Sequence, residues 1–288
     1  MNENGLLAAL RALPLHPGAR GLADDAAVLD LGGETLILTH DVMVEGVHWL
    51  PGQDMADVAW KLLAVNLSDL AAKGAEPVGV LLGYQLGEGD APFLRGLREG
   101  LEAFQVALLG GDTVAAAGQR SFGLTAIGRA THTPVPARSG ASVGDALFLA
   151  GPVGAAMLGF EAVRDATGAD SLAFRRPSPR LAEGQALAPL VSAMMDVSDG
   201  LLLDAQRMAE ASGMTICIDS SAVPFAGPAA RKAEAMRWGD DYALLFTAAA
   251  DSRLPVAAER IGRVVGRMGS PLLVDEVPAR EPLGYRHG

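Results

Sequence analysis

The chain has 288 residues, half of them hydrophobic, so it is long enough to build two domains with cores of their own. Its formal net charge of -11 argues against a nucleic acid partner, because phosphate backbones are bound by surfaces rich in lysine and arginine. A single cysteine, Cys217, excludes a disulfide framework and a zinc site made of thiolates.

The amino-terminal segment MNENGLLAALRAL lacks the basic start of a signal peptide, and Arg11 interrupts its apolar run. The longest uncharged stretch, residues 146–160, is shorter than the roughly 20 residues that a membrane-spanning helix needs. We therefore expect a cytoplasmic protein that has no membrane partner.

In the first half of the chain, strand-like segments alternate with segments of helical periodicity. Residues 35–44 predict a strand, and residues 54–75 predict a helix that Asp54 caps and Gly74 ends. A helix is predicted at about 92–105, and further strands are predicted at 77–86, 106–116 and 120–130.

Residues 131–145 are rich in Pro, Ser and Gly and show no periodicity, so they predict a junction between two domains. We expect one domain over residues 1–137 and a second over residues 138–288, with an α/β fold of the α+β type. The second domain is predicted to contain, in order, a strand at 146–151, a helix opened by a glycine, a loop at 175–180, a strand at 193–199, a helix at 200–213, strands at 214–220 and 242–248, and a last helix near 254–268.

Aspartates recur at the edges of apolar segments, where we expect strands to end. They are Asp24, Asp25, Asp41, Asp69, Asp112, Asp196, Asp199, Asp240 and Asp241. Any one of them is explained by helix capping or turn chemistry, and Asp204 by exposure on its helix. As a set they favour Mg²⁺, which binds oxygen ligands and bridges carboxylates to phosphates. Metal-assisted phosphoryl transfer is therefore the leading class of function.

The familiar phosphate-binding motifs are missing from the sequence. There is no GxxxxGK[ST] segment, neither of the protein kinase triplets HRD and DFG occurs, and the GxSxG motif of serine hydrolases is absent. Phosphates are then expected to be held through metal ions, arginines and backbone N–H groups at helix starts.

Several ordered motifs resemble one family, that of thiamine monophosphate kinase, within the superfamily of aminoimidazole ribonucleotide synthetase. They are GLADDAAVLD, THDVMVEGVHW, WKLLAVNLSDLAAKGAEP, LLGGDT, RSGASVGD, RPSPR, MDVSDGLLLD and WGDDYALLFT. The resemblance implies direct in-line transfer from ATP to thiamine monophosphate, with several Mg²⁺ ions and no protein nucleophile. It also implies a homodimer whose amino-terminal sheets pair into a barrel, with an ATP- and Mg²⁺-binding amino-terminal domain, an α/β sandwich as the second domain, and the nucleotide bound between the two domains.

The same resemblance implies individual roles. The expected Mg²⁺ ligands are Asp25, Thr39, Asp41, Asp69, Asp112, Asp196 and Asp199. The expected ATP contacts are Gly111, Asp112, Arg138 and Ser198, and the expected contacts of thiamine monophosphate are His48 and Asp240.

Two departures from the family pattern affect the expected site. His40 stands where a hydroxyl residue is usual, and it either approaches the metals or points away from them. Leu283 stands where the family has a tryptophan that stacks on the substrate. We hypothesise that Trp238, or failing that Tyr285, supplies the aromatic surface; the alternative is that Trp238 packs in the core of the second domain.

Two other functions remain open from the sequence. The nearer alternative is another member of the superfamily. A selenophosphate synthetase is expected to have a reactive cysteine or selenocysteine near its amino terminus, and the hydrogenase-maturation member a carboxy-terminal cysteine; this chain has neither. The second is a noncatalytic nucleotide-binding protein that kept the fold, against which the complete set of metal carboxylates argues.

Overall fold

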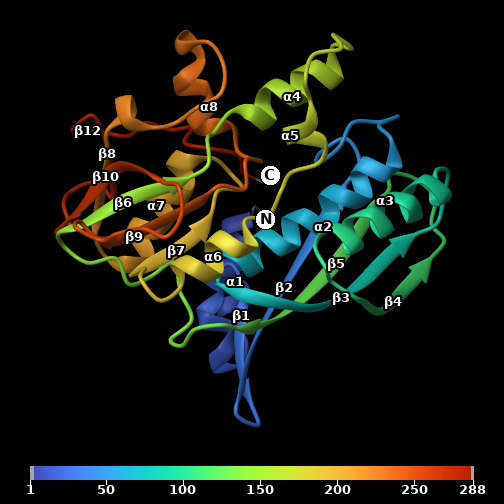
Figure 1. Cartoon of the computed structure of the whole chain (residues 1–288), viewed down its shortest axis with the longest axis horizontal. Coiled ribbons are helices and arrows are strands. Elements are labelled where there is room, and N and C mark those ends of the chain that lie inside the picture. Colours follow the sequence, from blue (N-terminus) through green and yellow to red (C-terminus); the bar gives the residue numbers. More distant parts are fainter. Residues whose placement is uncertain (1–2, 287–288) are drawn as a thin grey trace.

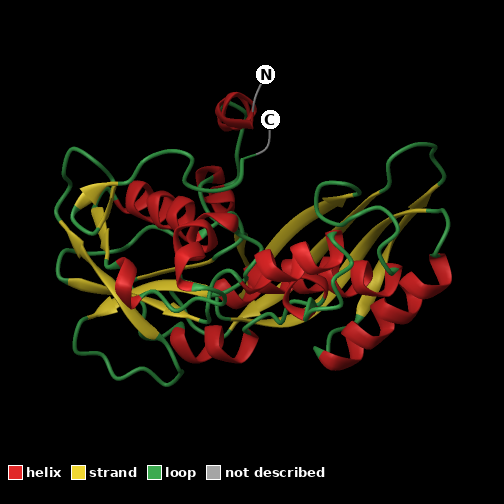
Figure 2. Cartoon of the chain, turned by 90° about the horizontal axis from the view of Figure 1, so that it is seen from above, coloured by secondary structure: helices red, strands yellow, loops and turns green. Residues whose placement is uncertain are grey.

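The computed structural model describes residues 3–286 and contains two open β-sheets that lie side by side with helices packed on them (Figures 1 and 2). The five-stranded sheet has the order β1-β2-β5-β3-β4, and the seven-stranded sheet has the order β12-β11-β8-β10-β6-β9-β7. Within residues 3–286 neither sheet closes on itself. The predicted mixed α/β fold with two domains is confirmed.

The amino-terminal sheet follows the predicted strands and adds a short one before them. Its strands are β1 (Ala27–Leu31), β2 (Glu34–Val44), β3 (Ala75–Gln85), β4 (Leu108–Val114) and β5 (Ser121–Ala130). In this sheet β3 and β4 pair in parallel and the other neighbouring strands pair antiparallel, and helix α3 (Asp90–Ala103) makes the crossover between β3 and β4. The short helix α1 (Glu3–Arg11) precedes the sheet.

Helix α2 (Met55–Ala72) begins and ends where its sequence predicts. The side chain of Asp54 accepts a hydrogen bond from the Ala56 N–H, and Gly74 follows the helix with φ of +60°. Almost all of α2 is buried because it contacts β2 and β5 on one side and α6 and β7 of the second domain on the other. In residues 3–286, no helix is long and apolar enough to cross a membrane.

The carboxy-terminal sheet packs helices on both faces. Its strands are β6 (Asp145–Ala150), β7 (Ala193–Asp196), β8 (Thr215–Ile218), β9 (Leu244–Ala249), β10 (Glu259–Val265), β11 (Leu272–Val274) and β12 (Val277–Pro278). The helices of this part are α4 (Ala155–Arg164), α5 (Leu172–Arg175), α6 (Leu181–Leu187), α7 (Leu201–Ser212) and α8 (Lys232–Trp238). One core lies under α7, and a second joins this sheet to the end of α2 through Phe148, Phe246 and Ala71.

The helix predicted near residues 254–268 is wrong. Residues 259–265 form strand β10, which pairs with β6 on one side and β8 on the other. The segment holds Ile261 and a valine pair, which favour a strand, and Gly262, which disfavours a helix. Strand β10 fills the position between β6 and β8. Pairing with both β6 and β8 in the middle of the sheet therefore stabilises this segment as a strand.

The contact between α6 and α2 predicts a stability change. Gly184 lies where α6 crosses α2, and a Cβ at this position would overlap the Ala71 carbonyl oxygen. We expect Gly184→Ala to lower the free energy of unfolding by about 1–3 kcal/mol in a urea titration, because the helices must move apart. Gly269→Ala, in open space, is the control and should change it little. Equal stability of the two variants would contradict a tight crossing.

Candidate active site

A cavity of about 510 Å³ takes its walls from both domains. It brings together most of the site residues predicted from the sequence, although they come from distant segments. Those that line it are Asp25, Asp41, His48, Asp69, Arg138, Asp196, Ser198, Asp199, Trp238 and Asp240. This volume is typical of a site for a small-molecule ligand.

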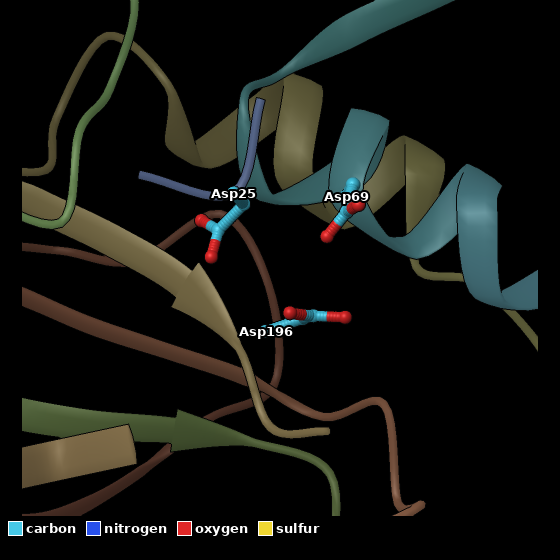
Figure 3. A group of neighbouring side chains, drawn as sticks. All are labelled: Asp25, Asp69 and Asp196. Atoms are coloured by element: carbon cyan, nitrogen blue, oxygen red, sulfur yellow. The ribbon is translucent and has the colours of Figure 1, made fainter. Parts of the chain in front are cut away.

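Three carboxylates form the acidic end of the cavity (Figure 3). One oxygen each from Asp25, Asp69 and Asp196 lies within 4.8 Å of the other two. Asp25 precedes β1, Asp69 lies in the last turns of α2, and Asp196 ends β7. Of these three aspartates, only Asp196 lies at the end of a strand, as we expected for all of them. Asp69 instead reaches the cavity from one face of helix α2.

Burial and the charges of neighbouring carboxylates raise the pKa values of three aspartates at this end, Asp196, Asp69 and Asp41. Burial raises the pKa of Asp196 to about 8, and the charge of Asp25 adds to the shift. The pKa of Asp69 lies well above its ordinary value because of burial and the charges of Asp41 and Asp196. Burial, with the charges of Asp25 and Asp199, raises the pKa of Asp41 to about 6. The acidic end therefore holds more carboxylates than the neighbouring positive charges can keep ionised.

Hydroxyl and amide groups orient the cluster. Thr39 donates its hydroxyl hydrogen bond to Asp69, and Ser68 donates to Asp196 at 2.6 Å. The Asn66 side chain accepts a hydrogen bond from the backbone N–H of Asp41 at 3.0 Å. These partners come from β2 and α2, so the amino-terminal domain fixes carboxylates of both domains.

The donor set fits a hard divalent cation such as Mg²⁺. All three candidate ligands offer carboxylate oxygens, which this ion prefers. The raised pKa values of Asp69 and Asp196 indicate that added positive charge would stabilise their ionised forms. Asp25 lies between two cationic side chains, Arg138 and Lys73, the latter 2.6 Å from its Oδ2. The residues present can therefore hold a metal ion.

Asp204 was expected to be exposed on its helix, and this prediction is wrong. It is fully buried in the first turn of α7, where its Oδ2 accepts the N–H groups of Ser198 and Asp199, both at 3.1 Å. Arg207 donates to both Asp199 and Asp204. Burial raises the pKa of Asp204 to about 7, although Arg207 opposes the shift. Asp204 thus holds the loop that follows Asp196.

Asp240, on another part of the cavity wall, lies in an ordered hydrogen-bond network. Lys61, buried on α2, donates to Asp240 and, at 3.1 Å, to the carbonyl oxygen of His48. Its ammonium lies 4.0 Å from the centre of the Phe174 ring. Tyr242 donates its hydroxyl hydrogen bond to Asp240 at 2.8 Å. Asp240 is therefore held in one orientation.

Aromatic side chains line the cavity next to Asp240. Trp238 is half-buried at the end of α8, and its ring centre lies 5.3 Å from that of Phe160. Phe174 and Tyr285 also line the cavity. Leu283 is buried in the core under α7. An aromatic surface thus exists in the cavity, and Trp238 is part of it, whereas Leu283 is not.

Gly111 and Asp112 do not join the acidic cluster within the chain. They lie on the exposed edge strand β4, which β5 and β3 separate from β2 and its Asp41. At the usual spacing of neighbouring strands, the three steps from β2 to β4 correspond to a distance of about 14 Å.

His40 points away from the carboxylate cluster. It alternates along β2 with Thr39 and Asp41, and its Nδ1 lies 2.8 Å from the Thr125 hydroxyl on the opposite face of the sheet. The alternative in which His40 approaches the cluster is therefore wrong.

Two lysines of this site were missed by the sequence reasoning. Lys61, Val65, Asp69 and Lys73 follow one another at intervals of four along α2, so they share one face. Charged residues at this spacing in an otherwise apolar helix are a signal that the helix turns a polar stripe to a buried site. The buried ion pairs of both lysines confirm this pattern.

Family models match both domains. Residues 23–130 match the AIR synthase related protein, N-terminal domain, and residues 142–271 match the AIR synthase related protein, C-terminal domain. The two domains and the carboxylate-lined cavity between them therefore define an AIR synthase related protein. Within that class, the chain belongs to the thiamine-monophosphate kinase family, as its relatives show.

The thiamine-monophosphate kinase of Salmonella typhimurium is 36% identical over 282 residues, which cover 88% of this chain and 85% of that protein. The enzyme of Caulobacter vibrioides is 43% identical over 218 residues, 72% of this chain but only 62% of the relative. The solved structure of AaThiL complexed with AMPPCP and TMP has a TM-score of 0.87 at 28% identity and covers 100% of this chain and 97% of that one. The chain is thus a kinase by its family.

The raised carboxylate pKa values predict how stability depends on pH and Mg²⁺. Between the ordinary pKa of 3.8 and about 8, folded Asp196 binds more protons than the unfolded chain does, so stability falls as the pH rises. We expect the melting temperature in EDTA to be lower at pH 8 than at pH 6, and Mg²⁺ to raise it more at pH 8.

The variant Asp196→Asn is the control for this prediction. It keeps an oxygen that can accept the Ser68 hydrogen bond but removes the charge, so its melting temperature in EDTA should depend less on pH. An equal pH dependence in both proteins would show that the cluster is not its source.

Proposed function

We propose that this chain transfers the γ-phosphoryl group of ATP to the phosphate of thiamine monophosphate, giving ADP and thiamine diphosphate. The observation that carries the proposal is that a single cavity joins an acidic end, able to hold metal-bound phosphates, to an aromatic end that fits a flat cationic ligand. The family to which the chain belongs and the solved AaThiL complex with AMPPCP and TMP support it.

At the acidic end, Mg²⁺ would be held by Asp25, Asp69 and Asp196, with Asp41 and Asp199 beside them. When bound, it would supply charge neutralisation for the two phosphate groups, whose mutual repulsion otherwise opposes their approach. Asp112 does not line the cavity of the single chain, so it would join this ligand set only if pairing of two copies brought strand β4 near a cavity.

The chain's own groups position the nucleotide. Arg138 offers a guanidinium at the cavity wall. Helix α7 begins at Leu201, two residues after Asp199, so Ser198 and its neighbours lie near the positive end of the helix. Transfer is in line, and no general base is needed because the attacking phosphate oxygen is already ionised. Catalysis is then mainly positioning and stabilisation of charge.

At the other end, thiamine monophosphate would present a pyrimidine and a cationic thiazolium ring. Asp240 offers acceptor oxygens to donor groups, while Trp238 and its aromatic neighbours offer a surface for the cation. His48 accepts the Val44 N–H on Nδ1, so its neutral ring carries the proton on Nε2 and is a donor there.

We further propose that two copies pair through their amino-terminal sheets to form a barrel. Strands β3 and β4, at one edge of the amino-terminal sheet, expose apolar side chains that a second copy would cover. Among them are Leu81, Leu108, Leu109 and Val114. The position of Asp112 on the exposed edge β4 agrees with a site to which pairing contributes.

The reaction is tested by incubating the protein with ATP, MgCl₂ and thiamine monophosphate and measuring ADP and thiamine diphosphate. We expect both products in equal amounts, and a loss of at least about 100-fold in turnover for Asp196→Asn, because a metal ligand is removed. Asp251→Asn, on the exposed surface, is the matched control and should keep full activity. Folded protein that forms no thiamine diphosphate, or an active Asp196→Asn variant, would refute the proposal.

Trp238 provides a test of the substrate end. Trp238→Ala should raise the KM for thiamine monophosphate severalfold and leave the KM for ATP nearly unchanged, since a cation on an aromatic face gains roughly 0.5–2 kcal/mol. Trp238→Phe keeps an aromatic ring, so its KM for thiamine monophosphate should lie between those of the wild type and of Trp238→Ala. A lower melting temperature with both KM values unchanged would instead show that Trp238 only packs against Phe160.

A further inference from the structure

Lys73 is a completely buried lysine at the acidic end of the cavity, directly after α2. Its ammonium lies 2.5 Å from Asp24 Oδ1 and 2.6 Å from Asp25 Oδ2. It also donates a hydrogen bond to the Met194 carbonyl oxygen on β7 at 3.2 Å. The proposed reaction assigns no role to this cation.

The contacts of Lys73 occupy its ammonium with protein atoms. The ammonium donates hydrogen bonds to Asp24 and to the Met194 carbonyl oxygen and forms an ion pair with Asp25, so it acts on a ligand through these protein partners. One partner, Asp25, belongs to the carboxylate cluster, and Arg138 holds the other oxygen of Asp25. Lys73 is therefore a positioning residue.

Asp24 completes the surroundings of Lys73. It pairs with Arg20 at 2.6 Å as well as with Lys73, and its side chain is almost completely buried. Each of the two aspartates beside Lys73 is thus paired with Lys73 and with one arginine.

We propose that Lys73 is the resident counter-ion of the carboxylate cluster, which positions Asp25 and sets how tightly the cluster binds a divalent cation. The inference rests on the proposed Mg²⁺ site. A fixed positive charge in contact with Asp25 repels an arriving cation, so it keeps the empty cluster stable at the expense of metal affinity.

Two effects of removing Lys73 have opposite signs, and this separates the proposal from a purely structural role. Without the ammonium, Asp24 and Asp25 lose a buried partner, so the metal-free protein becomes less stable. The same loss leaves the cluster more negative, so Mg²⁺ binds more tightly. A residue that only holds the fold would on removal weaken Mg²⁺ binding or leave it unchanged.

The test is isothermal titration of MgCl₂ into the nucleotide-free protein, with melting temperatures measured in EDTA. We expect Lys73→Met to lower the Kd for Mg²⁺ at least about tenfold and to lower the melting temperature in EDTA. Lys61→Met is the matched control. This lysine is buried on the same helix and paired with Asp240, so its loss should destabilise the protein with a smaller change in Kd.

A charge-balanced variant covers the case in which Lys73→Met alone does not fold. The double variant Asp24→Asn with Lys73→Met removes one charge of each sign, and its Kd for Mg²⁺ should lie within about threefold of the wild type. An unchanged or higher Kd for folded Lys73→Met, or a double variant that binds Mg²⁺ much more weakly, would overturn the role of Lys73. Wild-type protein that binds no Mg²⁺ would overturn the proposed metal site itself.

Discussion

Repulsion between buried carboxylates is the interaction on which the rest of this structure depends. Oxygen atoms of Asp25, Asp69 and Asp196 lie within 4.8 Å of one another, and burial strengthens the repulsion between ionised carboxylates. The fold tolerates the cluster because hydroxyl donors and the cations Lys73 and Arg138 surround it. The excess of negative charge is also what makes the cluster suitable for divalent cations and, through them, for phosphates.

Helix α2 connects this cluster to the fold. It is packed between the amino-terminal sheet and the second domain, so a polar stripe on one of its faces reaches both ends of the cavity. Asp69 and Lys73 lie at the acidic end, and Lys61 lies at the aromatic end beside Asp240. One rigid helix therefore sets the distance between the two proposed substrate subsites, which in-line transfer requires to be constant.

The two ends are also joined in the second domain. The backbone N–H of Asp240 donates to the Ser198 carbonyl oxygen at 2.7 Å, and that of Tyr242 donates to Val197 at 2.9 Å. Both Asp240 and Tyr242 have positive φ, of 62° and 52°, a conformation that costs energy in residues with side chains. Such strain persists because the loop after Asp196 and the loop at Asp240 hold each other in place.

The sequence by itself determined the α/β class, the capped helix at residues 54–75 and the carboxylates of the cavity, because these depend on local periodicity, capping and motif order. The tertiary structure alone decided that residues 259–265 form a central strand, that Asp204 is buried under its own loop and that His40 faces away from the cluster. It also revealed Lys73 beside Asp25. The physical reason is that burial, and which charges become neighbours, depend on contacts between segments far apart in the chain.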